Sequence, residues 1–435
     1  MTTMLRSYFD ALGGTPPYRW AGSVRQAVGQ LVESEGPCCS VGECCSIYDS
    51  SGVAHPGEIV GFRGSVVLSM LLASTAGVRY GDRIESDGQR PSIGVSPTML
   101  GCVIDGGGRP LEAGKGYRPV ESRPLDGPPI SPLERVPIRQ PIGCGVRAID
   151  GLLTCGRGQR VGIFGGSGVG KSTLLGMMAR GTSADMTVLA LIGERGREVR
   201  EFLEETLGEE GRRRSVVVVS TSDQSPLLRI RAAMAATAIA EYFSDCGKHV
   251  LLVLDSITRL AMARREVGLA AGEPPTAKGY TPSVFGMLAR VIERAGCRRN
   301  GSITAFYTVL MEGDDQQDPI VDAVRSLLDG HVLLDRRLSA AGHYPPIHLL
   351  DSLSRLMTNV CSAEHLAKAA GVRQLLAAYQ RSEDLIRIGA YQKGTDAALD
   401  RALELLPQIN EFLCQGAAER APLAETLDRL RRLPQ

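Results

Sequence analysis

The sequence contains no apolar run long enough to cross a membrane. Its most apolar windows, such as residues 66–73, fall well short of the roughly 20 residues that a membrane-spanning helix needs. The first residues, MTTMLRSYFDALGG, also lack the basic start and apolar core of a secretory signal. We therefore expect a cytoplasmic protein.

An excess of positive charge is missing as well. The 49 Lys and Arg residues nearly balance the 48 Asp and Glu residues, which gives a formal net charge of +1. Such a balance argues against a protein that binds nucleic acid by bulk electrostatics. The length of 435 residues instead indicates an ordinary globular chain of several domains, because single cores seldom grow past about 250 to 300 residues.

Paired cysteines in a short domain, the mark of a disulfide framework, are also absent. The chain has 11 cysteines, an odd count that fits a reducing compartment. Cys38, Cys39, Cys44 and Cys45 form a C-C-x4-C-C cluster that could in principle bind a metal. Zinc sites usually space their cysteines as C-x₂₋₄-C pairs, so the cluster also fits small buried side chains.

The distribution of strand-like and helical patterns predicts four segments. After a short N-terminal segment, residues 1–19, short β-rich runs separated by turn residues predict a small β-barrel over residues 20–90. Residues 91–358 should form a nucleotide-binding domain that begins with Gly- and Pro-rich loops. Residues 359–435 carry apolar residues at helical spacing, punctuated by Gly389, Gly394 and Pro407, and should form a helical domain.

In the central segment, apolar strands alternate with helical stretches, a pattern typical of a parallel sheet with crossover helices and hence of the α/β class. The expected strands are Arg160–Phe164, Thr187–Gly193, Ser215–Ser220, His249–Asp255 and Ile303–Leu310. In such sheets ligands bind beyond the carboxyl ends of the strands. Four of these ends carry polar chemistry: the loop after Phe164, Glu194, Asp255, and EGDDQQDP after Leu310.

The loop after Phe164 fills every fixed position of the phosphate-binding pattern G-x-x-x-x-G-K-[ST]. Glycines let the backbone curl so that its N–H groups face phosphate oxygens, and the helix that begins near Lys171 adds its positive end. Lys171 should reach the β- and γ-phosphates, and the Ser172 hydroxyl should hold Mg²⁺. The predicted nucleotide-binding residues of this loop are Gly165, Gly166, Ser167, Gly168, Val169, Gly170, Lys171, Ser172 and Thr173.

Two carboxylates at strand ends are the candidate partners of this loop. Asp255 ends the strand of LLVLDS and is a candidate second Mg²⁺ ligand, although such strings also occur as plain helix caps. Glu194 could polarise the water that attacks the γ-phosphate, and Arg195 could fix the phosphate or Glu194. The alternative for Glu194 is an exposed acid at a salt-bridged helix start.

Arg355 is a candidate for stabilising charge on the transferring phosphoryl group. It follows a predicted strand, Ile347–Leu350, and its guanidinium is planar and always ionised. An arginine of this kind, supplied by a neighbouring subunit, accelerates phosphoryl transfer by about 10³ to 10⁵. One sequence does not decide whether Arg355 acts within its own subunit or on a neighbour.

These motifs stand in long strings that resemble the type III protein-export ATPases of the bacterial flagellum and of virulence injectisomes, a family related to the catalytic subunit of the rotary ATP synthase. The strings are GGSGVGKSTLLGMMAR, LIGERGREVREF, TSDQSPLLRIRAA, LDSITRLAMARREVGLAAGEPP, GYTPSVF, GSITAFYTVL and RIGAYQKGTD. The resemblance spans residues 22–415. It implies a P-loop RecA-type core between the barrel and the helices, and hydrolysis of ATP with Mg²⁺.

The resemblance also assigns roles. It makes Lys171 and Ser172 the phosphate and Mg²⁺ ligands, Glu194 the water-activating carboxylate and Asp255 the second metal acid. Arg355 falls on the finger that reaches the next subunit's nucleotide, and Tyr344, in GHYPPI, falls beside the adenine ring, where an aromatic face can stack.

The same resemblance implies a homohexamer at the cytoplasmic face of the inner membrane. The expected partners are the stalk, regulator and gate proteins of an export apparatus and complexes of substrates with their chaperones. The chain departs from the family pattern at His348, Cys102 and Ala289, where relatives have aspartate, arginine and proline. Of these, His348 could alter the subunit contact or its pH response.

Three other functions compete with this interpretation. A rotary-synthase subunit would carry an acidic DELSEED-like run, which the C-terminal segment lacks. An RNA translocase such as Rho would need basic residues interleaved with aromatics in its barrel. The N-terminal segment offers Phe62, Tyr48 and Tyr80 with few lysines, so we expect no nucleic-acid partner. A non-hydrolysing scaffold would be expected to lose Glu194 or Arg355. Between the two export machines, the strings LVESEGP, EIVGFRGSVVL and GAYQKGTDAALDRAL favour the flagellar one.

Overall fold

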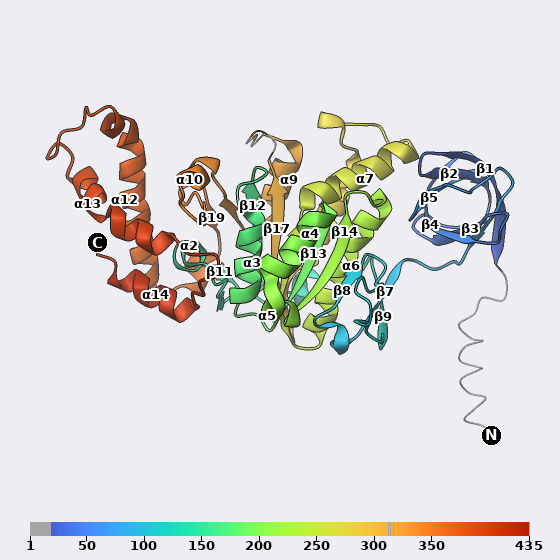
Figure 1. Ribbon diagram of the computed structural model, residues 1–435, viewed down its shortest axis with the longest axis horizontal. Helices are drawn as coiled ribbons and strands as arrows, with labels where there is room; N and C mark the ends of the chain where they lie inside the picture. The colour runs from blue at the N-terminus through green and yellow to red at the C-terminus, as the bar shows by residue number, and fades with distance from the viewer. Residues whose placement is uncertain (1–18, 312, 314, 316, 435) are drawn as a thin grey trace, which may run out of the picture.

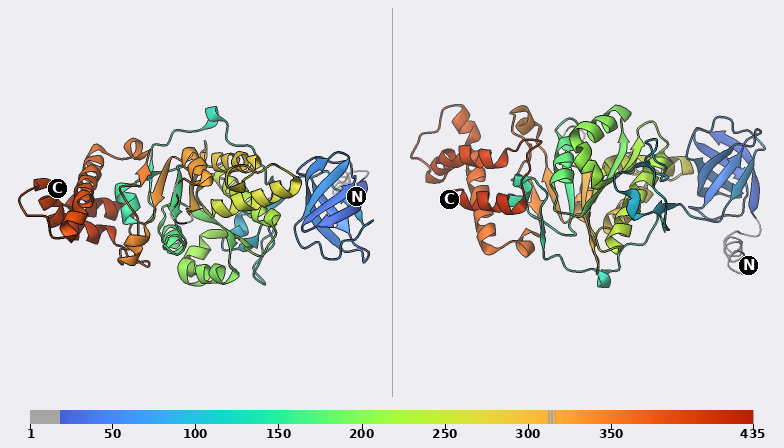
Figure 2. Two further views of the ribbon diagram at one scale, coloured as in Figure 1. Left: turned by 90° about the horizontal axis from the view of Figure 1, so that it is seen from above. Right: turned by 60° about the horizontal axis from the view of Figure 1, so that its bottom comes forward.

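The computed structural model describes residues 19–434 apart from 312, 314 and 316, so the predicted segment 1–19 lies almost wholly outside the described residues. The chain forms three parts in a row (Figure 1): a β-barrel at one end, a sheet covered by helices in the middle, and a group of helices at the other end. Figure 2 shows the same order from two further directions, with the C-terminal helices far from the barrel.

The predicted N-terminal barrel is confirmed. Its six strands close in the order β1-β2-β5-β4-β3-β6, and all neighbours in the ring are antiparallel. Alternating side chains point inward, where Val24, Val32, Ile47, Ile59 and Ile84 are almost fully buried. The strands are β1 Trp20–Val28, β2 Leu31–Glu35, β3 Cys44–Tyr48, β4 Ala54–Arg63, β5 Val66–Leu71 and β6 Arg83–Ser86.

The Gly- and Pro-rich segment after the barrel runs along the central part of the molecule. It contains a two-stranded sheet of β7 Ser92–Val95 and β9 Glu121–Pro124, and β8 Val103–Asp105, which joins the edge of the main sheet. The short elements around these strands are η1 Pro97–Met99, η2 Pro132–Glu134, β10 Pro141–Ile142, α2 Arg147–Leu152 and β11 Cys155–Gly156.

The central sheet has the order β19-β18-β12-β17-β15-β13-β14-β8, in which β18 is Gly330–Leu333 and β19 is Leu353–Ser354. The strands from β18 to β8 run parallel. All five predicted strands are present: β12 Arg160–Gly165, β13 Met186–Glu194, β14 Ser215–Thr221, β15 His249–Asp255 and β17 Ser302–Leu310. Each is mostly apolar and is buried along almost its whole length, because both faces of the sheet are covered. A short strand, β16 Gly296–Cys297, pairs with β17 at its start.

Helices cover the two faces of this sheet and build two separate cores. One face packs on α6 Pro226–Asp245, α7 Ile257–Ala271, α8 Pro282–Glu293 and α9 Pro319–Leu327. The other face packs on α3 Lys171–Gly181 and on the π-helical turn η3 Phe202–Leu207, which lies between α4 Gly196–Glu201 and α5 Gly208–Arg213. Because side chains alternate along a strand, Val188 lies in the first core and Leu189 in the second.

One predicted strand, Ile347–Leu350, is wrong. The strand in this region is β18 Gly330–Leu333, and its antiparallel partner is the two-residue β19 Leu353–Ser354. Ile347 forms only an isolated bridge to Leu334. The run has an irregular conformation instead, and its residues Ile347 and Leu349 are buried in a core that includes residues of the C-terminal helices. The helix α10 Arg336–Ala340 lies between β18 and this run, and a further short element, η4 Ala277–Gly279, lies between α7 and α8.

The C-terminal part is helical, as predicted, but Pro407 does not end a helix. It lies inside α13 Ala397–Leu413 and is exposed. Proline removes one backbone hydrogen bond, yet the opposite face of α13 buries Leu399, Leu405 and Ile409, and this packing holds the helix together. The other helices are α11 Met357–Val360, α12 Ala363–Arg387 and α14 Leu423–Arg432. Gly389 and Gly394 lie between α12 and α13, as predicted.

The four clustered cysteines of the barrel do not gather at one point. Cys38 is exposed, Cys45 is buried in the barrel core, and the Sγ of Cys44 lies 3.7 Å from the guanidinium of Arg231. Among the described residues, no three His, Cys, Asp or Glu side chains are arranged to hold a metal ion. Across the residues that the structure describes, no helix has the length and apolar character needed to span a membrane. We retain residues 20–90, 91–358 and 359–435 as proposed domains.

Candidate functional site

The phosphate loop connects β12 to α3 at the carboxyl edge of the sheet. Gly168 and Gly170 have φ values of 76° and 95°, a left-handed conformation that strains any residue with a Cβ. Gly165 is also enclosed, since a Cβ there would lie 3.1 Å from the side chains of Leu334 and Val169. The pattern of glycines therefore fixes a curled backbone at the N-terminus of α3, the geometry that binds phosphate.

Lys171 is the first residue of α3, and its side chain folds back over the loop. Its ammonium donates to the carbonyl oxygens of Gly165 and Gly166, at 3.2 and 3.0 Å. Burial lowers the pKa of Lys171, whereas the carboxylates of Asp255 and Glu194 act in the opposite direction. The lysine is thus a buried cation that two carboxylates face from neighbouring strands.

Asp255 is the last residue of β15. In the sheet, β17 lies between β15 and β12, the strand that leads into the phosphate loop. The Asp255 carboxylate is buried, and the Thr308 hydroxyl donates to its Oδ1 at 2.6 Å. Burial raises the pKa of Asp255, while Thr308 and Lys171 favour the ionised form. Ser172 lies in the first turn of α3 with an exposed side chain. A carboxylate and a hydroxyl are oxygen ligands of the kind that Mg²⁺ takes together with waters and phosphates, so these residues fit the predicted metal.

Glu194 ends β13, the strand on the other side of β15. Leu191 pairs with Asp255, so Glu194 lies three residues further along β13, where it pairs with Thr221 of β14. Burial and the negative charge of Asp255 raise the pKa of Glu194 to about 7. The exposed acid that we considered as an alternative does not match this environment, because Glu194 is partly buried among charged groups.

Arg195 follows Glu194 and lies at the rim of the site. Its side chain is 78% exposed, and its Nη1 is 3.7 Å from Glu198 in the first turn of α4. The arginine that faces the carboxylates is Arg259, on the first turn of α7, which sequence reasoning missed. Its charge favours the ionised forms of Glu194 and Asp255. Its position four residues after Asp255, one turn into the helix that follows the strand, is the signal that could have revealed it.

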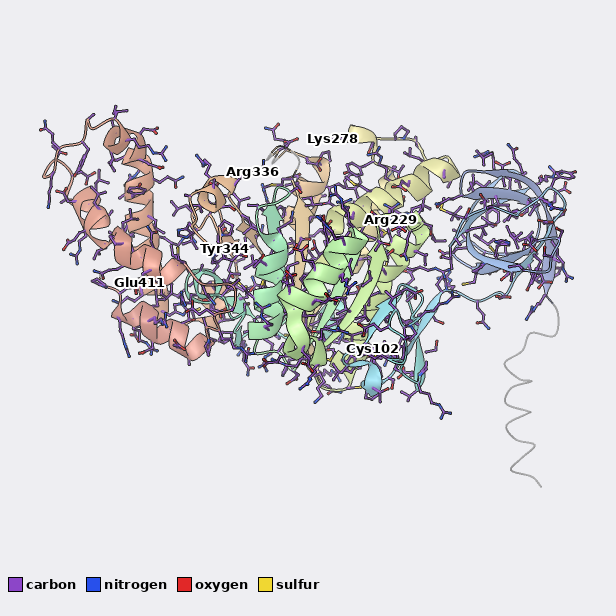
Figure 3. All side chains as sticks on the ribbon, in the orientation of Figure 1. Cys102, Arg229, Lys278, Arg336, Tyr344 and Glu411 are labelled. Carbon is purple, nitrogen blue, oxygen red and sulfur yellow. The ribbon has the colours of Figure 1, made fainter. Side chains whose placement is uncertain are left out.

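Tyr344 lies against the end of the phosphate loop. Its hydroxyl donates to the carbonyl oxygen of Gly170 at 3.2 Å, and its ring is close enough to Gly170 that a Cβ there would lie 3.0 Å from it. Burial raises the pKa of Tyr344, and the Thr173 side chain acts in the opposite direction. Figure 3 labels Tyr344 and also Arg336, whose guanidinium reaches the Ser167 carbonyl oxygen at 3.4 Å.

Arg355 does not join this group. Its backbone N–H donates to the Asp329 carbonyl oxygen at 3.0 Å, just before β18 begins, and its side chain is exposed. Asp329 also binds Arg160, the first residue of β12, whereas the phosphate loop follows the last residue of that strand. Arg355 is therefore at the amino end of the sheet, opposite the end that carries its own phosphate loop. Of the EGDDQQDP segment, Asp315 and Asp318 pair with the Lys278 ammonium at 2.7 and 3.0 Å, and residues 312, 314 and 316 are outside the described residues.

The family models that match the chain cover its central and C-terminal parts. The ATP synthase alpha/beta family, nucleotide-binding domain, matches residues 145–354, and the T3SS EscN ATPase C-terminal domain matches residues 361–432. A flagellum-specific ATP synthase of Bacillus subtilis is 50% identical over 430 residues, 98% of each chain. The chain belongs to the ATP synthase alpha/beta family.

Relatives of this ATPase occur in both branches of type III export. A flagellum-specific ATP synthase of Pseudomonas aeruginosa is 52% identical over 94% of this chain and 92% of its own length. Among solved structures, the assembled ATPase EscN of the enteropathogenic E. coli type III secretion system is 45% identical and has a TM-score of 0.89. The alignment covers 95% of this chain and 99% of EscN. A second EscN structure, in complex with its central stalk EscO, has a TM-score of 0.87 at 44% identity, over 95% and 99% of the two chains.

Proposed function

We propose that this protein is the ATPase of a bacterial flagellar type III export apparatus, in which ATP hydrolysis powers or gates the unfolding and export of substrate proteins. The observation that carries the proposal is the convergence of Lys171, Asp255 and Glu194 at one edge of the sheet. The chain that holds them aligns with flagellum-specific relatives over almost its whole length.

The phosphate end of the site would bind ATP through the curled loop and Lys171. Loop N–H groups and the positive end of α3 would hold the phosphates, and the lysine would leave its carbonyl partners for the β- and γ-phosphates. Ser172 and Asp255 would hold Mg²⁺, which when bound supplies positive charge to the phosphates. Thr308 keeps the Asp255 carboxylate oriented through its hydrogen bond.

The chemical step needs a base and charge stabilisation. Glu194, with a pKa of about 7, would orient the attacking water and accept its proton. Arg259 favours the ionised forms of the carboxylates, and Arg195 would contact the phosphate or Glu194 from the rim. Tyr344 would stack on the adenine at the other end of the nucleotide, because its ring flanks the end of the phosphate loop.

Arg355 would complete the site of a neighbouring subunit in a homohexamer. This assignment is supported by its position at the opposite end of the sheet from its own loop, and by the likeness to EscN, which has been solved in assembled form and with a stalk protein. We propose a stalk partner on the same basis. Regulator and gate proteins, substrate-chaperone complexes and a place at the cytoplasmic face of the inner membrane follow from the proposed function.

The experiment replaces Lys171 by alanine and compares it with Lys248→Ala, whose side chain is exposed on the turn after α6. In a strain that lacks the chromosomal copy, the wild type and Lys248→Ala should restore flagellin export and motility, and Lys171→Ala should not. The purified Lys171→Ala protein should also have no ATPase activity. Normal flagellin export from the deletion strain, with loss of injectisome secretion instead, would assign the chain to the other branch. Export restored by an inactive Lys171→Ala would reject hydrolysis as its role.

A further inference from the structure

The segment that follows α13 contains a buried amide that reaches the nucleotide-binding part of the chain. Gln415 is 3% exposed, and its side chain makes hydrogen bonds with both ends of the amide. Its Oε1 accepts from the Arg147 backbone N–H at 2.8 Å, and its Nε2 donates to the carbonyl oxygens of Gly145 and Glu419, at 2.9 and 3.0 Å. These bonds use both amide protons, so the side chain has one defined orientation.

A buried arginine fixes the same segment from the other side. Arg147, the first residue of α2, donates its Nε to the Phe412 carbonyl oxygen at 2.8 Å, and its other nitrogens contact the Cys414 carbonyl oxygen and the Glu419 carboxylate. These carbonyls belong to the C-terminal end of α13, where a positive charge is favourable. The backbone around Gln415 is therefore held on α2 by a satisfied, buried polar network.

This network ends at Tyr344. The backbone N–H of Gln415 donates to the Tyr344 carbonyl oxygen at 2.8 Å. The Tyr344 ring in turn lies against Gly170, at the end of the phosphate loop. Gln415, more than 70 residues away in sequence, thus sets the position of the backbone that carries the aromatic ring.

We propose that Gln415 is a positioning residue for the nucleotide base: its amide holds the segment after α13 against α2, and through it Tyr344. The inference rests on the proposed function, in which Tyr344 contacts the base. Two different ends of the ligand are then held by different parts of the chain. The phosphates depend on the loop and Lys171, whereas the base depends on a ring that the C-terminal segment positions.

This separation gives a test with a built-in internal standard. Gln415→Met keeps the length of the side chain and removes all three of its hydrogen bonds, and Gln408→Met, at an exposed position of α13, is the matched control. Dissociation constants are measured by calorimetry for ADP, which has a base, and for inorganic tripolyphosphate, which has none. We expect Gln415→Met to weaken ADP binding about tenfold and to leave tripolyphosphate binding within twofold, and Gln408→Met to change neither.

Tyr344→Ala and the double variant complete the experiment. If Gln415 acts through Tyr344, the double variant should bind ADP no more weakly than Tyr344→Ala alone, because both changes remove the same interaction. Fully additive losses would overturn the inference, and so would equal weakening of both ligands in Gln415→Met, which would indicate general damage to the site.

Two further outcomes separate the inference from the function on which it rests. Unchanged ADP binding in Gln415→Met, with weakened binding in Tyr344→Ala, would overturn the inference alone. Unchanged ADP binding in Tyr344→Ala would show that the proposed base contact itself is wrong. Should Gln415→Met fail to fold, Gln415→Asn, which keeps the amide but shortens its reach by one methylene, should show the same selective loss.

Discussion

Glu194 and Asp255 end adjacent parallel strands, and Glu194 lies three residues beyond the position that pairs with Asp255. This stagger separates the two carboxylates along the strand direction: Asp255 accepts from Thr308, whereas Glu194 pairs with Thr221 of β14. Burial and the charge of Asp255 raise the pKa of Glu194 to about 7, so it remains a stronger base than an exposed glutamate. Two carboxylates of the same chemistry are thereby suited to different tasks, one to a metal and one to a proton.

We predict that hydrolysis depends on Glu194 in its ionised form. The turnover number should rise with pH through about 7, because only the ionised carboxylate accepts a proton from water. Glu194→Gln should lower turnover about 10²- to 10⁴-fold while ATP still binds, since the phosphate loop is unchanged. Steady-state kinetics from pH 5.5 to 8.5 and nucleotide titration of both proteins would measure this. A Gln variant with near wild-type turnover would show that another group activates the water.

The same pKa shift gives a prediction for stability without nucleotide. The pKa of Glu194 is about 7 in the folded protein and 4.5 for the unperturbed group, so between these values the folded state binds more protons than the unfolded state. The stability contributed by Glu194 should therefore be present below about pH 4.5 and be lost as pH rises through 7. Thermal melts of wild type and Glu194→Gln should converge toward low pH, and the variant should be the more stable one at pH 8. Parallel curves across this range would argue against the raised pKa.

The parts of this molecule that could be predicted from sequence are those with local physical signals. Continuous apolar strands predict a covered parallel sheet, and the phosphate loop requires glycines at fixed spacing, so the strands and the nucleotide site followed from the residues. Pro407 and Ile347–Leu350 were misinterpreted because their conformations depend on packing against distant segments. Arg259, Thr308 and Gln415 were missed for the same reason: their importance comes from partners that only the fold brings near.

A buried ion pair joins the end of α8 to α6, and the loss of one of its partners should strongly destabilise the fold. Arg294, 2% exposed at the end of α8, contacts both carboxylate oxygens of Glu241 on α6 at 2.9 and 2.6 Å and donates to the Leu125 carbonyl oxygen at 2.6 Å. Removing one partner leaves a buried charge poorly compensated, which typically costs about 3–5 kcal/mol.

We therefore predict that Arg294→Met lowers the urea midpoint of unfolding strongly, whereas Arg299→Met, at an exposed position nearby, changes it little. The double variant Arg294→Met with Glu241→Leu should recover part of the loss, because it removes both charges. Equal midpoints for Arg294→Met and Arg299→Met would mean that solvent or Arg298, 3.1 Å from Glu241, replaces the lost partner.

The last prediction concerns Arg355 and the completeness of the site. Because this residue lies at the amino end of the sheet, away from its own phosphate loop, we expect it to act on a neighbour's nucleotide, so that specific activity rises with protein concentration as rings assemble. Arg355→Ala should lose most activity, about 10³-fold or more, and keep its fold and nucleotide affinity. Arg337→Ala, an exposed arginine on α10, is the matched control. Mixing inactive Lys171→Ala with inactive Arg355→Ala should restore part of the rate, because some interfaces then pair an intact loop with an intact finger. Within a single subunit neither variant holds a complete site, so a mixture that stays inactive while mass measurements show mixed hexamers would establish that Arg355 does not act across the interface.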